Sequence, residues 1–391
     1  MLDRLDPQPA DALLALIKMY ADDPRPGRID LGVGVYRTDD GSTPVFSAIK
    51  SAEGQLLAEQ DSKAYLGPEG DMGFVHALMP YIFGENATMH GRIQGMQTPG
   101  GTGAVRLALA LVKQAGVKRV LMGVPSWPNH AQILADVGLE VATFQHASAD
   151  GTADLEALRG ALDGAGAGDA VLLHGCCHNP TGIDYTHDQW DEIASMLAST
   201  GVLPLIDVAY QGLGQGMEED VYGLRAVLQA VPEALVAYSC DKNFGLYRDR
   251  VGAFYVMARK GDQLDTIMSN ANALARANWS MPPDHGGAAV RTVLRDAGMT
   301  DDWRAELASM RDRMRDVRAK LAAAGTAGSL DLTPLGKGHG LFAMLPLDKQ
   351  QIAALRRDHG VYMAGSGRIN VAGLHSGNID TFIAALSEVA S

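Results

Sequence analysis

The rest of the chain is organised around residues 238–250, which read Tyr238-Ser-Cys-Asp-Lys-Asn-Phe-Gly-Leu-Tyr-Arg-Asp-Arg250. It follows Ala234-Leu-Val-Ala-Tyr238, an apolar run that predicts a buried strand. Lys242 therefore stands at a strand end, where partial removal from water favours the neutral amine that condenses with an aldehyde. Ser239 and Arg250 could both turn toward one anion. Most lysines are solvated surface groups, so this stretch alone does not make Lys242 catalytic.

Length and composition indicate an ordinary globular protein of two domains. The chain has 391 residues, of which 47% are hydrophobic and 20% charged. A net charge of -13 argues against nucleic-acid or anionic-membrane partners, and no apolar run approaches the ~20 residues of a membrane span. Cys176, Cys177 and Cys240 form neither a disulfide framework nor a metal spacing. Because the N-terminus lacks an apolar signal core, we expect a cytoplasmic protein.

Short apolar runs alternate with helical or loop segments through the middle of the chain. This pattern predicts a mostly parallel sheet covered by helices on both faces. In such sheets ligands bind beyond the carboxyl ends of the strands, so the polar residues after each run are candidates for a site. The predicted strands are 119–123, 170–174, 202–207, 235–239 and 253–257.

The polar residues at these strand ends form a chemical set. Each has an ordinary structural explanation, since Asn179-Pro-Thr-Gly182 makes a good turn and an aspartate at a strand end often caps a helix. Packing explains their convergence on one edge much less well. The set comprises Trp127, His130, His174, Asn179, Asp207, Tyr210 and Lys242.

A glycine-rich stretch, Gln97-Thr-Pro-Gly-Gly-Thr-Gly-Ala104, opens a predicted helix. Free backbone N–H groups and the helix dipole at such a turn suit a phosphate group. A glycine-capped loop without a ligand explains the stretch equally well. It does not follow a strand in a G-x-G-x-x-G pattern, so we do not expect a dinucleotide site.

The remaining segments divide the chain into domains. Helices are predicted from about residue 11 to 20 and over 46–60, and 62–70 is a loop that carries Tyr65. Beyond residue 300 the apolar spacing predicts a long amphipathic helix, followed by strands within 338–345 and 362–371 and a helix over 377–390. We expect an N-terminal arm and part of the small domain in 1–44, a large domain in 45–305 and a small α+β domain in 306–391. The helix positions expected to be buried are Trp303, Leu307, Met310, Met314, Val317 and Leu321.

Four motifs follow one another along the chain, and the family resemblance depends on their order and spacing. They are residues 125–130 (Pro-Ser-Trp-Pro-Asn-His), 174–182 (His-Gly-Cys-Cys-His-Asn-Pro-Thr-Gly), 209–212 (Ala-Tyr-Gln-Gly) and 242–247 (Lys-Asn-Phe-Gly-Leu-Tyr). In these motifs the chain resembles the class I aspartate and aromatic amino-acid aminotransferases over nearly its whole length. The resemblance implies the α/β fold of type I pyridoxal 5′-phosphate (PLP) enzymes, with a mixed, mostly parallel sheet in the large domain. It also implies a homodimer with shared active sites.

The resemblance implies a role for each residue at the cofactor ring. Lys242 resembles the lysine that forms a Schiff base with PLP and then moves the proton between the substrate and the cofactor. Asp207 matches the carboxylate that keeps the pyridine nitrogen protonated. Trp127 matches the indole stacked on the ring, while Asn179 and Tyr210 match the groups that bind its phenolic oxygen. Two histidines are implied to support this machinery, His130 and His174.

The resemblance also implies groups that bind the phosphate and the substrate. Arg368 matches the arginine that binds the substrate α-carboxylate as a fork, and Gly34 matches a backbone contact to the substrate. Arg276 matches an arginine from the neighbouring subunit that binds a side-chain carboxylate. Trp127 and Asn179 also belong to the implied substrate site. The implied phosphate cradle comprises Gly101, Thr102, Ser239 and Arg250, with Tyr65 reaching in from the other subunit.

Two positions depart from the family pattern. Asp241 stands where the family usually has Ser or Thr against the phosphate, and an ionised carboxylate there would repel a phosphate. Met281 stands where aspartate-preferring members have Asn, which admits a bulkier or aromatic substrate. Val35, Arg37 and Thr43 look more like the aspartate branch.

The resemblance therefore implies a PLP-dependent aminotransferase that works by a ping-pong exchange between an L-amino acid and a 2-oxo acid. Aspartate and glutamate are the favoured donors. The alternatives are an aromatic aminotransferase of dual specificity, a β-lyase or decarboxylase that uses the same cofactor, and a PLP-binding sensor without enzymatic activity.

Overall fold

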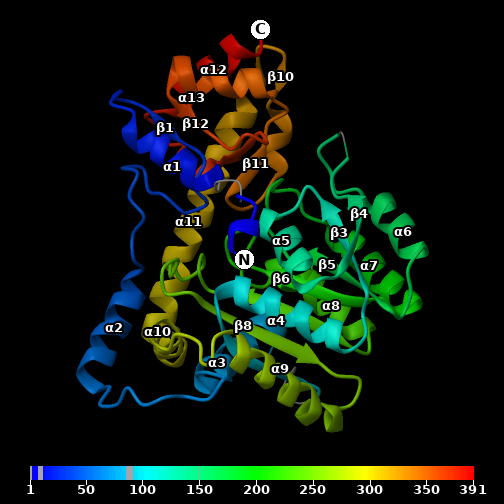
Figure 1. The fold of residues 1–391 in the computed structure, drawn as a ribbon. Coiled ribbons are helices and arrows are strands. Elements are labelled where there is room, and N and C mark those ends of the chain that lie inside the picture. Colours follow the sequence, from blue (N-terminus) through cyan, green and yellow to red (C-terminus); the bar gives the residue numbers. More distant parts are fainter. Residues whose placement is uncertain (1, 8–11, 85–90, 149) are drawn as a thin grey trace. The chain divides into compact units, whose positions relative to one another are not determined.

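The computed structural model describes residues 2–7, 12–84, 91–148 and 150–391, and it divides the chain into two compact units (Figure 1). The smaller unit combines residues 1–43 with 314–391, and the larger unit is 44–313. The sequence-based expectation placed these boundaries at 44/45 and 305/306. Among the described residues, no helix combines the length and the apolarity needed to cross a membrane.

The larger unit is built on a seven-stranded sheet of order β2-β8-β7-β6-β5-β3-β4. The strands β3 to β7 run parallel, whereas β8 is antiparallel to both β7 and β2. The predicted mixed, mostly parallel sheet is therefore confirmed. The bounds are β2 Ile93–Pro99, β3 Arg119–Val124, β4 Glu140–Gln145, β5 Asp169–His174, β6 Leu203–Val208, β7 Ala234–Ser239 and β8 Val251–Met257.

Helices surround this sheet, and alternate strand residues pack against them. Leu205 of β6 and Leu235 of β7 belong to one apolar cluster with Leu107 and Leu111 of α4. The next residue of each strand, Ile206 and Val236, is also buried and points to the other face of the sheet. The helices are α2 Ser47–Glu59, α3 Met72–Phe83, α4 Gly100–Gln114, α5 Pro128–Val137, α6 Leu155–Asp163, α7 His187–Thr200, α8 Tyr222–Ala230, α9 Leu264–Asn278 and α10 His285–Arg295, followed by α11 Ala297–Ala323. The predicted helix over 46–60 is confirmed as α2.

The strands β2 and β4 at the two sheet edges were not predicted, because neither is an apolar run. In β2 the Gln97 amide donates to Pro283 O (2.8 Å) and accepts from Asp71 N–H (2.8 Å), so a polar side chain is satisfied inside the protein. In β4 the side chains are largely exposed, as expected at an edge. β2 leads directly into α4, so the glycine-rich stretch follows a strand, and its sequence still lacks the G-x-G-x-x-G pattern of a dinucleotide site.

The smaller unit contains short strands and helices, as predicted for an α+β domain. β1 pairs in parallel with β12, and β11 pairs antiparallel with β13. The predicted start of the first helix at Asp11 lies outside the described residues. The elements are α1 Ala12–Asp22, β1 Ile29–Asp30, β9 Thr326–Ala327, β10 Leu330–Asp331, β11 Phe342–Met344, α12 Lys349–His359, β12 Val361–Tyr362, β13 Arg368–Asn370 and α13 Ile379–Val389.

The long helix α11 confirms the predicted amphipathic pattern. All six apolar positions named for it are buried, and Trp303 also donates its indole N–H to Asn243 O at 2.7 Å. Trp303 stacks on Phe244 with ring centroids 4.4 Å apart. This contact packs the helix against the loop that carries Lys242.

Candidate active site

Lys242 lies in the turn after β7, at the carboxyl edge of the sheet. Its Nζ lies 5.3 Å from the centre of the Tyr210 ring, which comes from the loop after β6. Burial lowers the pKa of the Lys242 ammonium, against the opposing charges of Asp241 and Asp207. The site therefore increases the fraction of neutral amine, the form needed for condensation with an aldehyde or for accepting a proton.

A directional chain of hydrogen bonds ends on Asp207. The backbone N–H of Asn179 donates to His174 Nδ1 (3.3 Å), so the proton of a neutral His174 is on Nε2. That N–H donates to Ser126 Oγ (3.2 Å), and the Ser126 hydroxyl donates to His130 Nδ1 (3.0 Å). His130 Nε2–H then donates to Asp207 Oδ2 (2.9 Å). Burial lowers the pKa of His174 well below its usual range, which keeps this ring neutral and the direction of the chain fixed.

The buried Asn179 amide offers a site for a further polar group. Its Nδ2 donates to the Tyr210 hydroxyl at 3.5 Å. Its Oδ1 is buried with no hydrogen-bond partner among the residues that the structure describes. The Trp127 ring lies 5.0 Å from that of His130 in an edge-to-face contact, at the same end of the strands. An aromatic face and an unsatisfied amide at one strand edge suit a polar heteroaromatic ring.

The glycine-rich turn at the start of α4 meets the loop after β7. Gly100 has a φ of +71°, and a Cβ there would lie 2.5 Å from Arg250 Nη2. A Cβ on Gly101 would lie 2.9 Å from Ser239 Cβ, so only glycine permits this approach. Thr102 occupies the first turn of the same helix. A guanidinium, a hydroxyl and a helix N-terminus thus come together, and these groups fit a phosphate.

Two implied site residues lie at exposed positions of the larger unit. Tyr65 is 95% exposed on the loop after α2. Arg276 is exposed near the end of α9, where its Nη1 donates to Ser280 Oγ at 2.7 Å. Leu66 N–H lies 3.1 Å from Met281 Sδ, so the loop of Tyr65 adjoins the segment that follows Arg276.

Gly34 and Arg368 belong to the smaller unit, where both contact Phe342. A Cβ on Gly34 would lie 2.7 Å from Phe342 Cζ. The Arg368 guanidinium lies 4.5 Å from the centre of the same ring, and its Nη2 donates to Gly32 O at 2.9 Å. Phe342 was not singled out in the sequence, because it reads there as an ordinary strand residue.

Sequence reasoning also missed the residues that link and extend the histidines. Ser126 lies within the quoted Pro-Ser-Trp motif, four residues before His130, and this was the signal that the sequence offered. In the structure its hydroxyl lies between His130 and His174. His178 packs on His174 with ring centroids 4.1 Å apart, and His146 stacks on His178 at 3.5 Å. Burial lowers the pKa of His146 to about 4 and that of His178 well below its usual range.

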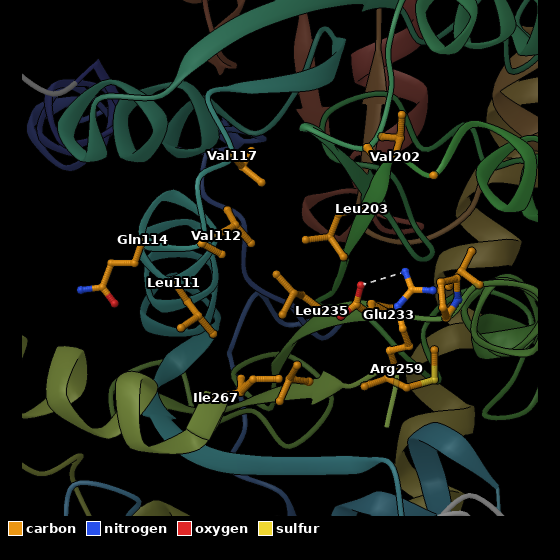
Figure 2. A pocket seen from close by; sticks show the side chains of 18 of the residues that line it. Leu111, Val112, Gln114, Val117, Val202, Leu203, Glu233, Leu235, Arg259 and Ile267 are labelled. Atoms are coloured by element: carbon orange, nitrogen blue, oxygen red, sulfur yellow. Dashed lines mark hydrogen bonds and ion pairs between the residues drawn. The ribbon is translucent and has the colours of Figure 1, made fainter. Parts of the chain in front are cut away.

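A separate cavity of about 550 Å3 lies at the amino edge of the sheet, where the parallel strands begin, opposite the carboxyl edge (Figure 2). Leu203 and Leu235, near the starts of β6 and β7, line it together with Val112 of α4. Since β7 has six residues, this edge is about 17 Å from the carboxyl edge. The charged groups in the lining are Glu233 and Arg259, which pair with each other at 3.4 Å. The buried amine of Lys242, the candidate phosphate cradle and the aromatic face are all at the carboxyl edge, which makes this edge the candidate active site.

Comparisons with known proteins agree with this geometry. The family model "Aminotransferase class I and II" matches residues 26–386. Tyrosine aminotransferase of Rhizobium meliloti (strain 1021) is 48% identical over 96% of each chain, and aspartate aminotransferase of Escherichia coli (strain K12) is 41% identical over all of both. An aromatic-amino-acid aminotransferase from Burkholderia pseudomallei, solved covalently bound to pyridoxal phosphate, is 31% identical with a TM-score of 0.95 over the full length of both chains.

The chain belongs to the class I and II aminotransferase family. The predicted family, the type I fold, the enzyme class and the PLP cofactor are thereby confirmed. Its substrates are accordingly an amino acid and a 2-oxo acid.

Proposed function

We propose that the enzyme exchanges amino groups by a ping-pong reaction, favouring aspartate and glutamate while also accepting aromatic amino acids. The observation that carries this proposal is the pairing of a partly desolvated amine, Lys242, with the buried and hydrogen-bonded carboxylate of Asp207 on one sheet edge. A relative named for tyrosine is 48% identical and one named for aspartate 41% identical, each over nearly the whole chain, which supports a dual specificity.

When bound, PLP supplies an aldehyde for the amino group and an electron-accepting ring that stabilises negative charge at the substrate Cα. Lys242 would take the proton from the substrate Cα and deliver it to the cofactor carbon that carried the aldehyde, and in the second half of the exchange it would move a proton the opposite way, so a neutral amine is required at the start of each half. The carboxylate of Asp207, held by His130, receives the ring N–H. Asn179 and Tyr210 bind the phenolic oxygen, and Trp127 covers one face of the ring. Ser239, Arg250, Gly101 and Thr102 hold the phosphate.

Two arginines distinguish the ends of the substrate in this proposal. Arg368 binds the α-carboxylate that every amino acid carries, with the backbone of Gly34 beside it. Arg276 binds a side-chain carboxylate, and its exposed position leaves it able to serve another subunit. Forked hydrogen bonds from a guanidinium fit a carboxylate in both roles. Met281 supplies an apolar surface for an aromatic side chain.

We further propose a cytoplasmic homodimer in which Tyr65 and Arg276 complete the partner's site. The loop that carries Tyr65 adjoins the segment after Arg276, and the large side chain of Leu57 nearby is 89% exposed. Tyr65 and Leu66 are exposed as well, on the loop that follows α2, and exposed apolar side chains that gather on one surface are typical of an interface. The three cysteines are buried and free, which fits a reducing compartment.

The proposed specificity is tested by a donor panel with 2-oxoglutarate as the acceptor. We expect 2-oxo acid products from aspartate, tyrosine and phenylalanine, with the highest kcat/KM for aspartate. A preference for phenylalanine over aspartate would contradict the assignment of Arg276. Release of CO2 or of a β-substituent without a 2-oxo acid product would contradict transamination itself.

The shared site is tested by mixing two chains that are each impaired with aspartate as the donor. A heterodimer of Lys242→Ala and Arg276→Ala chains has one site with both residues intact if Arg276 acts across the interface. We therefore expect partial recovery of aspartate activity, up to about half per heterodimer. Verified heterodimers without recovery would show that the sites are not shared.

A further inference from the structure

Asp241 lies inside the candidate phosphate cradle. The sequence alone did not show how a carboxylate is accommodated at this position. Its side chain is 3% exposed, and its Oδ1 accepts from Val251 N–H at 3.1 Å. Its Oδ2 forms a short ion pair with Arg250 Nη1. The same Oδ2 would lie 3.1 Å from a Cβ on Gly100, which places the carboxylate at the N-terminus of α4. The repulsion expected from this residue is therefore compensated by a guanidinium and a backbone N–H.

The guanidinium that pairs with Asp241 is Arg250, the same cation that the cradle would offer to a phosphate. Both hydrogen bonds of Arg250 that the structure describes use Nη1, to Asp241 and to Tyr247 O (3.1 Å). Nη2 points to Gly100 at the start of α4. Arg250 also has a φ of +56°, a left-handed backbone that a non-glycine residue adopts only when its surroundings impose it. The guanidinium is thus held by Asp241 on one side and faces the cradle with the other.

We propose that Asp241 is a positioning residue that fixes Arg250 and weakens the grip of the cradle on the cofactor phosphate, so that this enzyme holds PLP less tightly than the same cradle with a neutral residue would. This inference rests on the proposed function. A carboxylate and a phosphate that share one guanidinium repel each other, and at a few ångströms inside a protein this repulsion exceeds a tenfold effect on binding. Burial also raises the pKa of Asp241, against the charges of Lys242 and Arg250, which shows that the carboxylate charge is costly here before any phosphate is added.

The test compares the binding of PLP with that of pyridoxal, which has the same ring and aldehyde but no phosphate. Chains freed of cofactor are titrated with each compound, and the dissociation constant is read from the visible absorbance of the bound aldehyde. The variants are Asp241→Ser and Asp241→Asn, both of which remove the charge. Asp249→Ser is the matched control, because it removes one carboxylate from the same loop, where Asp249 Cβ lies against Gly286.

We expect Asp241→Ser to lower the Kd for PLP at least tenfold while the Kd for pyridoxal changes less than about threefold. Asp241→Asn should shift in the same direction, and Asp249→Ser should match the wild type. Unchanged or weaker PLP binding in both Asp241 variants would overturn the proposal. Equal tightening for PLP and pyridoxal would also overturn it, because the effect would not be on the phosphate. A wild-type chain that binds neither compound would contradict the proposed function itself.

Discussion

The carboxylate of Asp207 accepts a 2.9 Å hydrogen bond from His130 Nε2, and both side chains are buried. His174 donates to Ser126, and Ser126 donates to His130, so every hydrogen bond behind His130 has its donor directed toward Asp207. One oxygen of the carboxylate is therefore fixed by a complete chain of donors. The arrangement presents a preorganised anion to the cofactor, which is the form in which an electrostatic interaction contributes most to a reaction.

Replacing Asp207 by alanine should impair catalysis far more than cofactor binding. The carboxylate acts mainly on the charge that develops as the Cα proton leaves, so its loss affects the transition state selectively. We expect kcat to fall by roughly three orders of magnitude, about 4 kcal/mol, with the Kd for PLP raised about tenfold or less. Single-turnover kinetics and cofactor titration measure the two quantities. Near-normal turnover with PLP bound would refute the role given to Asp207.

Ser126→Ala should reveal the direction of the hydrogen-bond chain. Without the hydroxyl, His130 Nδ1 loses its donor, and the ring is no longer held in the tautomer that donates to Asp207. We expect kcat to fall about fivefold with KM little changed, and the pH profile of kcat to shift, since one hydrogen bond contributes about 1 kcal/mol. Ser195→Ala is the control, because Ser195 is exposed on α7 and donates to Asp191 O of the same helix. A uniform loss without a change in the pH profile would reduce Ser126 to a packing role.

Arg276→Ala should change substrate preference rather than activity in general. A forked ion pair in a partly desolvated pocket contributes a few kcal/mol, and each ~1.4 kcal/mol is tenfold. We expect kcat/KM for aspartate to fall about a hundredfold or more, while phenylalanine and tyrosine fall much less. Met281→Asn should raise the aspartate-to-phenylalanine ratio. Equal losses for both donors in Arg276→Ala would mean that this residue supports the site without selecting the side chain.

The buried histidine row makes the fold sensitive to acid. The pKa of His146 is about 4 in the folded chain against 6.5 for the free side chain, so the folded state binds fewer protons in this range. Stability is therefore lost as the pH falls from about 6.5 toward 4, and His146 alone contributes about 2 kcal/mol of that loss at pH 5. Between pH 7 and pH 5, His146→Phe should lose about 2 kcal/mol less stability than wild type, measured by urea unfolding.

The control for this measurement is His76→Phe, at an exposed position of α3. It should lose the same stability as wild type between the two pH values. If His146→Phe behaves like wild type as well, the stacked ring does not titrate as its burial implies.

Apolar runs predicted the central strands of the sheet because those strands are buried on both faces. The edges were missed for the opposite reason, since β2 satisfies the polar Gln97 internally and β4 exposes its side chains. Edge strands depend on neighbours that are distant in sequence, such as Asp71 and Pro283. Periodicity within a short window does not contain that information.

The candidate site was predictable where residue type and strand end coincide, as for Lys242 and Asp207. The partners of those residues were not. The pairing of Asp241 with Arg250 depends on the left-handed backbone at Arg250, and the stack of His146 on His178 joins two separate loops. Both relationships are consequences of tertiary packing, which fixes orientation after the residue types have fixed the chemistry.

The central claim is that Lys242 is the amine that carries the cofactor and moves the proton. Borohydride reduction of the PLP-loaded enzyme, followed by peptide mapping by mass spectrometry, tests it most directly. We expect one phosphopyridoxyl group per chain, on Lys242, and none on a folded Lys242→Ala variant. A label on a different lysine of the wild-type enzyme, in place of Lys242, would contradict this role of Lys242.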